Sequence, residues 1–159
     1  MISWGIAWTN AKIVSDYFSY TNLVFLRYLS SFIFLLPLLY FQRDKFETPS
    51  FKTSINILLI SLLFYVYNIS FFLGTNLGSA GLGGVFVTTT NPIITFILIS
   101  IISRAINKYQ ILGIMIGGIG GCIILDIFNL GFDAFNVSGN IYFIICSITW
   151  GIITVLMTY

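Results

Sequence analysis

Residues 80–102 read AGLGGVFVTTTNPIITFILISII, a long apolar run that contains no charged side chain. A helix crosses the hydrocarbon core of a bilayer with about 20 apolar residues. Segments in lipid must close their own backbone hydrogen bonds, so only helices and closed barrels span a membrane. Because this run is far longer than the alternating strand of roughly ten residues that builds a barrel, it predicts a transmembrane helix.

The composition of the whole chain indicates a membrane protein. Of the 159 residues, 58% are hydrophobic and 8% are charged, and the mean hydropathy is +1.00. Soluble domains carry about 25% charged residues, so this chain cannot cover itself with a polar surface. The net charge of +2 is small and the basic residues do not cluster, which excludes a nucleic-acid-binding surface. With no His and no thiol pair at metal-ligand spacing, we expect no metal and no other cofactor.

Apolar runs of this kind recur along the chain and predict an all-α integral membrane bundle of about six transmembrane helices. We place them at 1–14, 19–42, 55–76, 80–102, 108–127 and 138–159. The first segment is too short to span and lacks the basic start and cleavage site of a signal peptide, so we expect a helix without its beginning. The last segment stops at Tyr159 with no polar tail, and we therefore expect a fragment of a longer protein.

The basic residues between the predicted helices give an orientation. The connection 43–54 holds Arg43, Lys45 and Lys52, and 103–108 holds Arg104 and Lys108, whereas the intervening connections hold no Lys or Arg. Cytoplasmic loops carry the excess of Lys and Arg, so we expect these two connections on the cytoplasmic side.

A short repeat relates the two ends of the chain. Residues 2–6, ISWGI, recur as residues 148–152, ITWGI. The copies lie in the first and sixth predicted helices, which are offset by five helices, an odd number, so the second copy enters the membrane from the opposite side, as in inverted-topology transporter repeats. We therefore expect a first repeat of five helices over 1–127, its first helix truncated, and the first helix of a second repeat over 138–159.

The order of these features resembles the EamA type of the drug/metabolite transporter superfamily, over nearly the whole chain. The residues that carry the resemblance are Trp4, Gly5, Lys12, Arg27, Pro37, Asn91, Pro92, Gln110, Gly113, Gly139, Trp150 and Gly151. The chain departs from the family at Arg104, where members often carry a Glu, and in holding no counterpart of helices seven to ten.

The resemblance implies a multi-pass secondary transporter of the inner or plasma membrane, an exporter of a small metabolite or amphipathic compound. Its partners would be that solute and the lipid bilayer, with a homodimer left open and no nucleic acid. An enzyme is not expected, because no nucleophile, base or metal site converges. A structural or assembly subunit without transport activity needs only packing surfaces, and this alternative stays open.

Small residues in the fifth predicted helix form one line. Gly113, Gly117 and Gly121 are spaced by four residues, the pattern that lets membrane helices approach closely. We expect them to pack against another helix, and the other interpretation is a glycine face that lines a passage.

Polar residues beside a proline mark the fourth predicted helix. Pro92 cannot donate a hydrogen bond to the Thr88 carbonyl, and Thr88, Asn91 and Thr95 share one face. Broken helices near the midplane are where transporters often bind solute. Alternatively, the threonines bond to their own helix and Asn91 holds a neighbouring helix.

Tyr65 and Asn68 belong to a comparable stripe in the third predicted helix, which suits either an amphipathic solute or helix packing. Combining the two helices, we expect Tyr65, Asn68, Thr88 and Asn91 to face one shared cavity.

Arg27, Trp4 and Trp8 complete the predicted solute path, and Lys12 lies near them but is not assigned to it. Lys12 and Arg27 fall within the spans, where a charge is costly. Lys12 suits either an interfacial anchor or a functional role, and Arg27 either pairs with a helix-end carbonyl or Asp126, or meets an anionic solute. Trp4 and Trp8 line up with Lys12, although interfacial belts also place Trp near a membrane face.

The cysteines are assigned no function. Cys122 and Cys146 both lie inside predicted spans, where thiols behave as small apolar residues, and we expect no disulfide between them.

Overall fold

The computed structural model describes residues 2–42, 48–103, 107–124, 126–131, 133 and 137–158, and its regular elements there are all helices. In chain order they are α1 (Ile2–Ser15), α2 (Tyr20–Phe41), α3 (Phe51–Leu77), α4 (Ala80–Ser103), α5 (Lys108–Ile124), α6 (Ile127–Leu130) and α7 (Asn140–Thr158). The predicted all-α bundle is confirmed. Its division into a repeat over 1–127 and the start of another over 138–159 stays a prediction.

Helix ends follow local capping signals that hydropathy does not contain. α3 begins at Phe51, earlier than the predicted residue 55, because the Ser50 hydroxyl caps it by accepting a hydrogen bond from the Thr53 amide at 3.2 Å. α5 ends at Ile124, earlier than predicted, and Asp126 adopts a left-handed conformation with φ of 56° before the single turn of α6.

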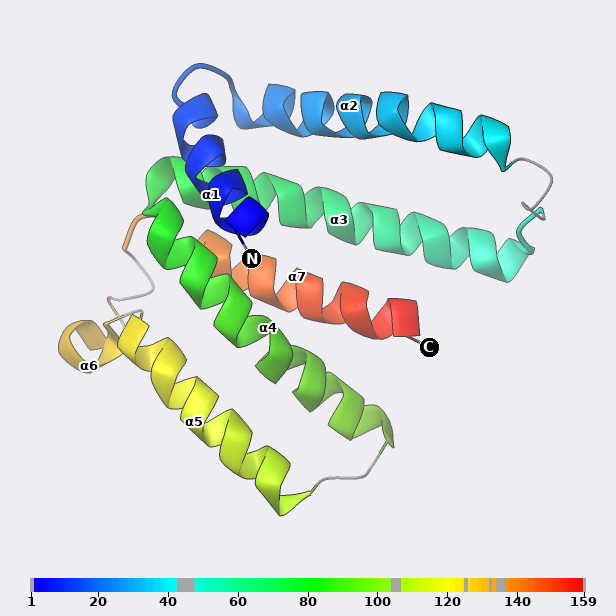
Figure 1. The fold of residues 1–159 in the computed structure, drawn as a ribbon. Helices are drawn as coiled ribbons and strands as arrows, with labels where there is room; N and C mark the ends of the chain where they lie inside the picture. The colour runs from blue at the N-terminus through cyan, green and yellow to red at the C-terminus, as the bar shows by residue number, and fades with distance from the viewer. Residues whose placement is uncertain are drawn as a thin grey trace.

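The helices form a fan in which α7 is central. Figure 1 shows the order α2, α3, α7, α4 and α5 across the molecule, with α1 crossing one end of α3 and α4. α7 shares its most extensive interfaces with α3 and α4, whereas α2 packs mainly on α3, and α5 mainly on α4. The last helix of the chain thus lies between two helices that the sequence leads one to expect side by side.

Glycines allow α7 to approach α3 and α4 closely. The Phe143 ring is fully buried and lies against the backbone of Gly74 in α3 and Gly83 in α4. A Cβ atom added at Gly74 would lie 2.6 Å from Cε1 of Phe143, so neither glycine can carry a side chain without displacing the ring. Gly139, with φ of 91°, turns the chain into α7 against Gly78.

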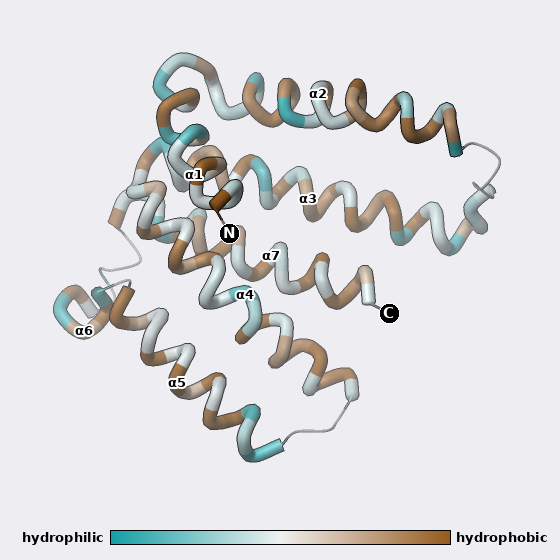
Figure 2. Tube along the Cα trace, viewed as in Figure 1, coloured by the Kyte–Doolittle hydropathy of each residue, from teal (hydrophilic) through white to brown (hydrophobic). Residues whose placement is uncertain are grey.

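The lengths of the helices decide which of them can cross a membrane. α2, α3, α4 and α7 are long and apolar enough, whereas α5 has 17 residues and α1 has 14. Figure 2 shows brown and white along most of each helix, as a lipid-facing bundle requires. Within the residues that the structure describes, four of the six predicted segments therefore have the full length of a span. Arg43, Lys45 and Arg104, on which the predicted orientation largely depends, lie outside the described residues.

Candidate functional site

A cavity of about 530 Å³ lies between α1, α4 and α7. Its lining residues are Trp4, Thr88, Asn91, Pro92, Thr95, Phe96, Ile99, Trp150 and Thr154. The structure therefore brings together Trp4, Thr88, Asn91 and Pro92 from the predicted solute path. We call this space the central cavity.

Two tryptophans from opposite ends of the sequence line the central cavity. Trp4 is on α1 and Trp150 is on α7, and both belong to the repeated five-residue motif. The Trp150 ring packs against Tyr67, with ring centroids 5.0 Å apart, and edge-on against Phe64 at 5.8 Å. Trp150 is not part of the solute path predicted from the sequence, where it supports only the repeat and the family resemblance. The repeat itself was the signal, because it makes Trp150 the counterpart of Trp4.

The polar side chains of α4 bond to helix backbone while they line the cavity. The Thr88 hydroxyl donates to the Gly84 carbonyl at 2.8 Å, or to that of Val85 at 2.9 Å. The Asn91 amide fits its surroundings only with its nitrogen facing the carbonyls of Ser147 in α7 and Val87 in α4, and in that orientation it donates to them at 3.2 Å and 3.3 Å. These bonds agree with the packing interpretation of the stripe, in which Asn91 holds a neighbouring helix. Thr88 and Asn91 also line the central cavity, and their contact with a solute stays a prediction.

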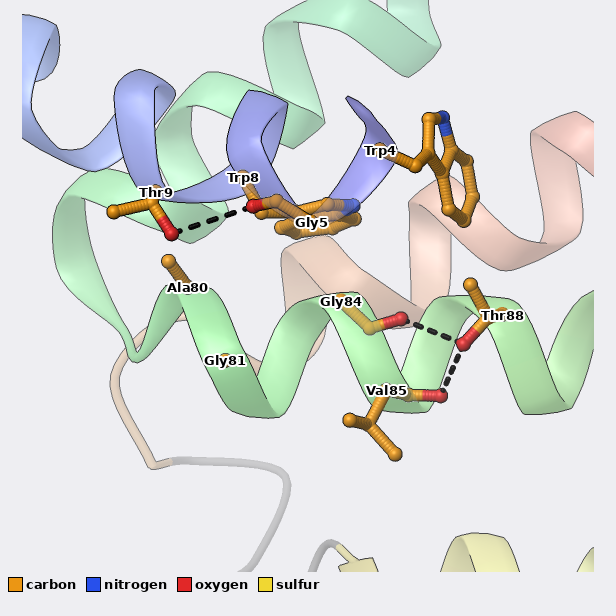
Figure 3. Close-up of a pocket in the computed structure, with 9 residues that line it drawn as sticks. All are labelled: Trp4, Gly5, Trp8, Thr9, Ala80, Gly81, Gly84, Val85 and Thr88. Atoms are coloured by element: carbon orange, nitrogen blue, oxygen red, sulfur yellow. Dashed lines mark hydrogen bonds between the residues drawn. The ribbon is translucent and has the colours of Figure 1, made fainter. Parts of the chain in front are cut away.

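A second, smaller space of about 300 Å³ adjoins the central cavity at Trp4 and Thr88 (Figure 3). Trp8 lines it from α1, although the Trp8 side chain is only 4% exposed. Its ring packs against Phe71 with centroids 4.6 Å apart and against Phe143 at 5.9 Å. Trp8 is therefore a core residue that forms one wall of the space, and its burial is unlike that of an interfacial belt residue.

The two α3 residues of the predicted path, Tyr65 and Asn68, do not line the central cavity. The prediction that they share one cavity with Thr88 and Asn91 is therefore wrong. Asn68 is buried at the α2 interface, where its Nδ2 donates to the Tyr28 hydroxyl at 2.9 Å and to the Phe64 carbonyl at 2.8 Å. Tyr65 is 46% exposed and does not line the central cavity. The physical reason is α7, which packs between α3 and α4 and separates their polar stripes.

The two basic residues within the spans have different environments. Lys12 donates from Nζ to the Asn76 carbonyl near the end of α3, at 2.6 Å. The Arg27 guanidinium lies over the Phe71 ring, 5.4 Å from its centroid, beside a third cavity between α1, α2 and α3. The predicted alternative of an ion pair between Arg27 and Asp126 is not formed. The Asp126 carboxylate instead accepts a hydrogen bond from Asn129 at 2.6 Å.

The glycine line of α5 packs against α4 over part of its length. A Cβ at Gly117 would lie 2.7 Å from Cδ1 of Ile93, and one at Gly121 would lie 3.8 Å from Phe86. Nothing lies within 4 Å of the corresponding position at Gly113. Gly117 and Gly121 therefore pack against α4, as predicted, whereas Gly113 borders an open space beside Pro92 and Gln110.

An apolar helical bundle with several membrane-spanning helices around an aromatic and polar cavity defines a multi-pass membrane protein. The sequence model of the EamA-like transporter family matches residues 1–126, so the chain belongs to this family. It is a membrane transporter of the drug/metabolite type, and members of the family are transporters, not enzymes. No curated protein and no solved structure matches the chain significantly.

Proposed function

We propose that this protein is a secondary transporter that exports a small, uncharged or weakly charged amphipathic compound across the inner or plasma membrane. The observation that carries the proposal is the central cavity, whose wall joins both copies of the repeated tryptophan to the polar stripe of α4. Within this proposal, Trp4, Trp8, Thr88, Asn91 and Pro92 belong to the solute path.

The size and chemistry of the central cavity support this class of solute. Small-molecule sites have volumes of about 300–1,000 Å³ and are mostly apolar with a few polar groups. The wall combines the rings of Trp4, Phe96 and Trp150 with threonine hydroxyls and one amide, and none of its residues is charged. Aromatic rings bind apolar and planar groups, whereas an isolated strong charge would lack a counter-charge there.

The direction of transport and the membrane are supported by the family resemblance. In the predicted orientation α4 runs inward from Ala80, so the central cavity, which extends from Thr88 to Ile99, reaches from the middle of α4 into its cytoplasmic half. A solute collected from the cytoplasm or inner leaflet would enter at that level.

Filling the central cavity tests the proposal. Thr154 lines the cavity from α7, and Thr158 lies one turn further along the same helix, at an exposed position outside the cavity wall. Each hydroxyl donates to the carbonyl four residues earlier. Thr154→Phe should therefore fill the cavity, and Thr158→Phe is the matched control. The measurement is the efflux of a panel of neutral and weakly basic fluorescent dyes from cells that express the full chain.

We expect the wild-type protein and the Thr158→Phe variant to lower dye accumulation, and Thr154→Phe to lose most of this effect at equal membrane abundance. Equal efflux by both variants would refute the cavity as the solute site. An absence of efflux by the wild-type protein for every dye would favour the structural-subunit alternative, which the bond from Asn91 to α7 also suits.

A further inference from the structure

The third cavity is separate from the central cavity and combines a cation with apolar walls. It has a volume of about 340 Å³ and lies between α1, α2 and α3. Its lining residues are Ala7, Asn10, Ala11, Val14, Leu23, Arg27, Phe71 and Phe72. We call it the Arg27 groove.

The Arg27 guanidinium has no charged partner among the residues that the structure describes. Arg27 is exposed, its guanidinium lies over the face of the Phe71 ring, and no ion pair or hydrogen bond from the guanidinium is formed in the described ranges. Arginine carries five N–H donors, which a ring face cannot satisfy. A charge within a span is costly unless it is paired, so this guanidinium requires an anion or a polar surface.

Lys12 shows how the same requirement is met elsewhere in the bundle. Its ammonium group donates to the Asn76 carbonyl at 2.6 Å, at the negative end of the α3 helix dipole. Arg27 has no such carbonyl acceptor in the described structure, although α3 lies directly beside it. The groove therefore leaves the guanidinium donors available to a ligand.

Packing of α2 fixes Arg27 at the groove and leaves the groove open to the bilayer. The neighbouring Tyr28 hydroxyl accepts a hydrogen bond from Asn68 at 2.9 Å, which sets the rotation of α2 on α3. The buried residues of α2 are Leu23 and Val24, so most of this helix faces outward. Arg27 is seven residues after Tyr20, about 10 Å along the helix from its predicted outer end, within reach of a headgroup by a long side chain.

We propose that the Arg27 groove binds an anionic amphiphile, whose phosphate or carboxylate head pairs with Arg27 and whose apolar part lies along Leu23, Phe71 and Phe72. Guanidinium forms paired hydrogen bonds with such heads, and the Asn10 amide adds a polar group beside them. The site is distinct from the central cavity, to which α2 contributes no residue. The head belongs to a membrane phospholipid or to a free amphiphilic anion, and both present the same chemistry to Arg27.

Lipid retention measures occupancy of this site. The full chain would be placed in nanodiscs that contain equal amounts of phosphatidylglycerol and phosphatidylcholine. Native mass spectrometry would then count the lipids of each kind that stay bound when the protein is released from the nanodisc. We expect enrichment of phosphatidylglycerol on the wild-type chain, at least a fivefold loss in Arg27→Gln, and partial retention in Arg27→Lys. Lys52→Gln is the charge-matched control, because Lys52 is exposed in the first turn of α3, and it should behave like wild type.

A second variant separates binding from folding. Ala7→Phe fills the groove without changing the charge, and it should reduce retention while Arg27 remains. Dodecyl phosphate, added as a soluble probe, distinguishes the two sources. If it binds the wild-type chain but not Arg27→Gln, and phosphatidylglycerol is not enriched on the wild-type chain, the groove takes a free amphiphilic anion and the site is still supported. Equal retention of lipid and of dodecyl phosphate by wild type, Arg27→Gln and Ala7→Phe would overturn the proposal.

Discussion

The ammonium group of Lys12 and the backbone carbonyl of Asn76 are joined by a 2.6 Å hydrogen bond that ties α1 to the end of α3. The tie is reciprocal, because Nδ2 of Asn76 donates to the Ser15 carbonyl at 3.0 Å. A cation beside the last carbonyls of a helix also meets the negative end of its dipole. Lys12 is thus a structural link between two helices. Its role as an interfacial anchor stays a prediction.

We predict that Lys12→Met destabilises the bundle. A hydrogen bond to a charged group contributes about 1.5–3 kcal/mol, and the Met side chain keeps the apolar stem. The melting temperature in detergent should fall for Lys12→Met and recover largely in Lys12→Arg. Lys52→Met, at an exposed position, is the control. An unchanged melting temperature in Lys12→Met would contradict a structural role for this bond.

The α5 glycines provide a matched pair of variants. Gly117→Leu must displace Ile93 of α4, whereas the position at Gly113 is open. Overpacking costs about 1–3 kcal/mol, so Gly117→Leu should unfold at lower temperature and assemble poorly, while dye preference per folded molecule stays unchanged. Gly113→Leu should remain near wild type. Normal stability with altered preference in Gly117→Leu would instead make the glycine face part of a passage.

The interface around Phe143 should be the most sensitive part of the bundle. Phe143→Ala removes a fully buried ring and leaves a void between Gly74 and Gly83, at a cost of about 3–5 kcal/mol. We expect a large drop in the folded yield of the full chain in detergent. Phe128→Ala is the control, because that ring is 71% exposed. A similar yield for both variants would show that α7 does not depend on this contact.

Hydropathy predicted the six longer helices but not their ends or the single turn of α6, because lipid requires long apolar segments whatever their neighbours are. It could not determine which helices touch. Asn68 and Asn91 are both amides within apolar helices, and the sequence alone treats them alike. The structure directs Asn68 to Tyr28 of α2 and Asn91 to Ser147 of α7.

The position of α7 decided which predicted site residues meet. No periodicity within α3 or α4 indicates that a helix from the far end of the chain lies between them. The sequence feature that relates to this packing is a pair of small residues, because Gly74 and Gly83 leave the space that Phe143 fills. Pairing a ring with two distant glycines requires three-dimensional information, whereas pairing Trp4 with Trp150 required only the repeat.

The orientation of the chain is testable by labelling. In a chain without its native thiols, Cys122→Ser and Cys146→Ala, we predict that Thr48→Cys resists a membrane-impermeant maleimide in intact cells and reacts after lysis. Thr48 is exposed, and unlike Ser50 it does not cap α3. Tyr17→Cys, in the exposed connection that follows α1, should react in intact cells. The reverse pattern would invert the orientation and the level of the central cavity.

The final prediction concerns Asn91, whose side chain is 8% exposed, lines the central cavity and donates to α7. Asn91→Leu keeps a similar volume and removes the amide. The Ser147 and Val87 carbonyls lie within helices, where backbone amides also serve as donors, so the loss of stability should be only about 1 kcal/mol.

If Asn91 contacts the solute or its water, Asn91→Leu should abolish dye efflux while the amount of folded protein in the membrane stays near wild type. Thr89→Val is the control, because Thr89 is exposed on α4, lies outside the cavity wall and bonds only to its own helix. The measured quantity is efflux divided by folded protein, which separates the two roles of Asn91. A bracing role alone would lower efflux in proportion to folded protein and leave their ratio unchanged, and that result would remove Asn91 from the solute path.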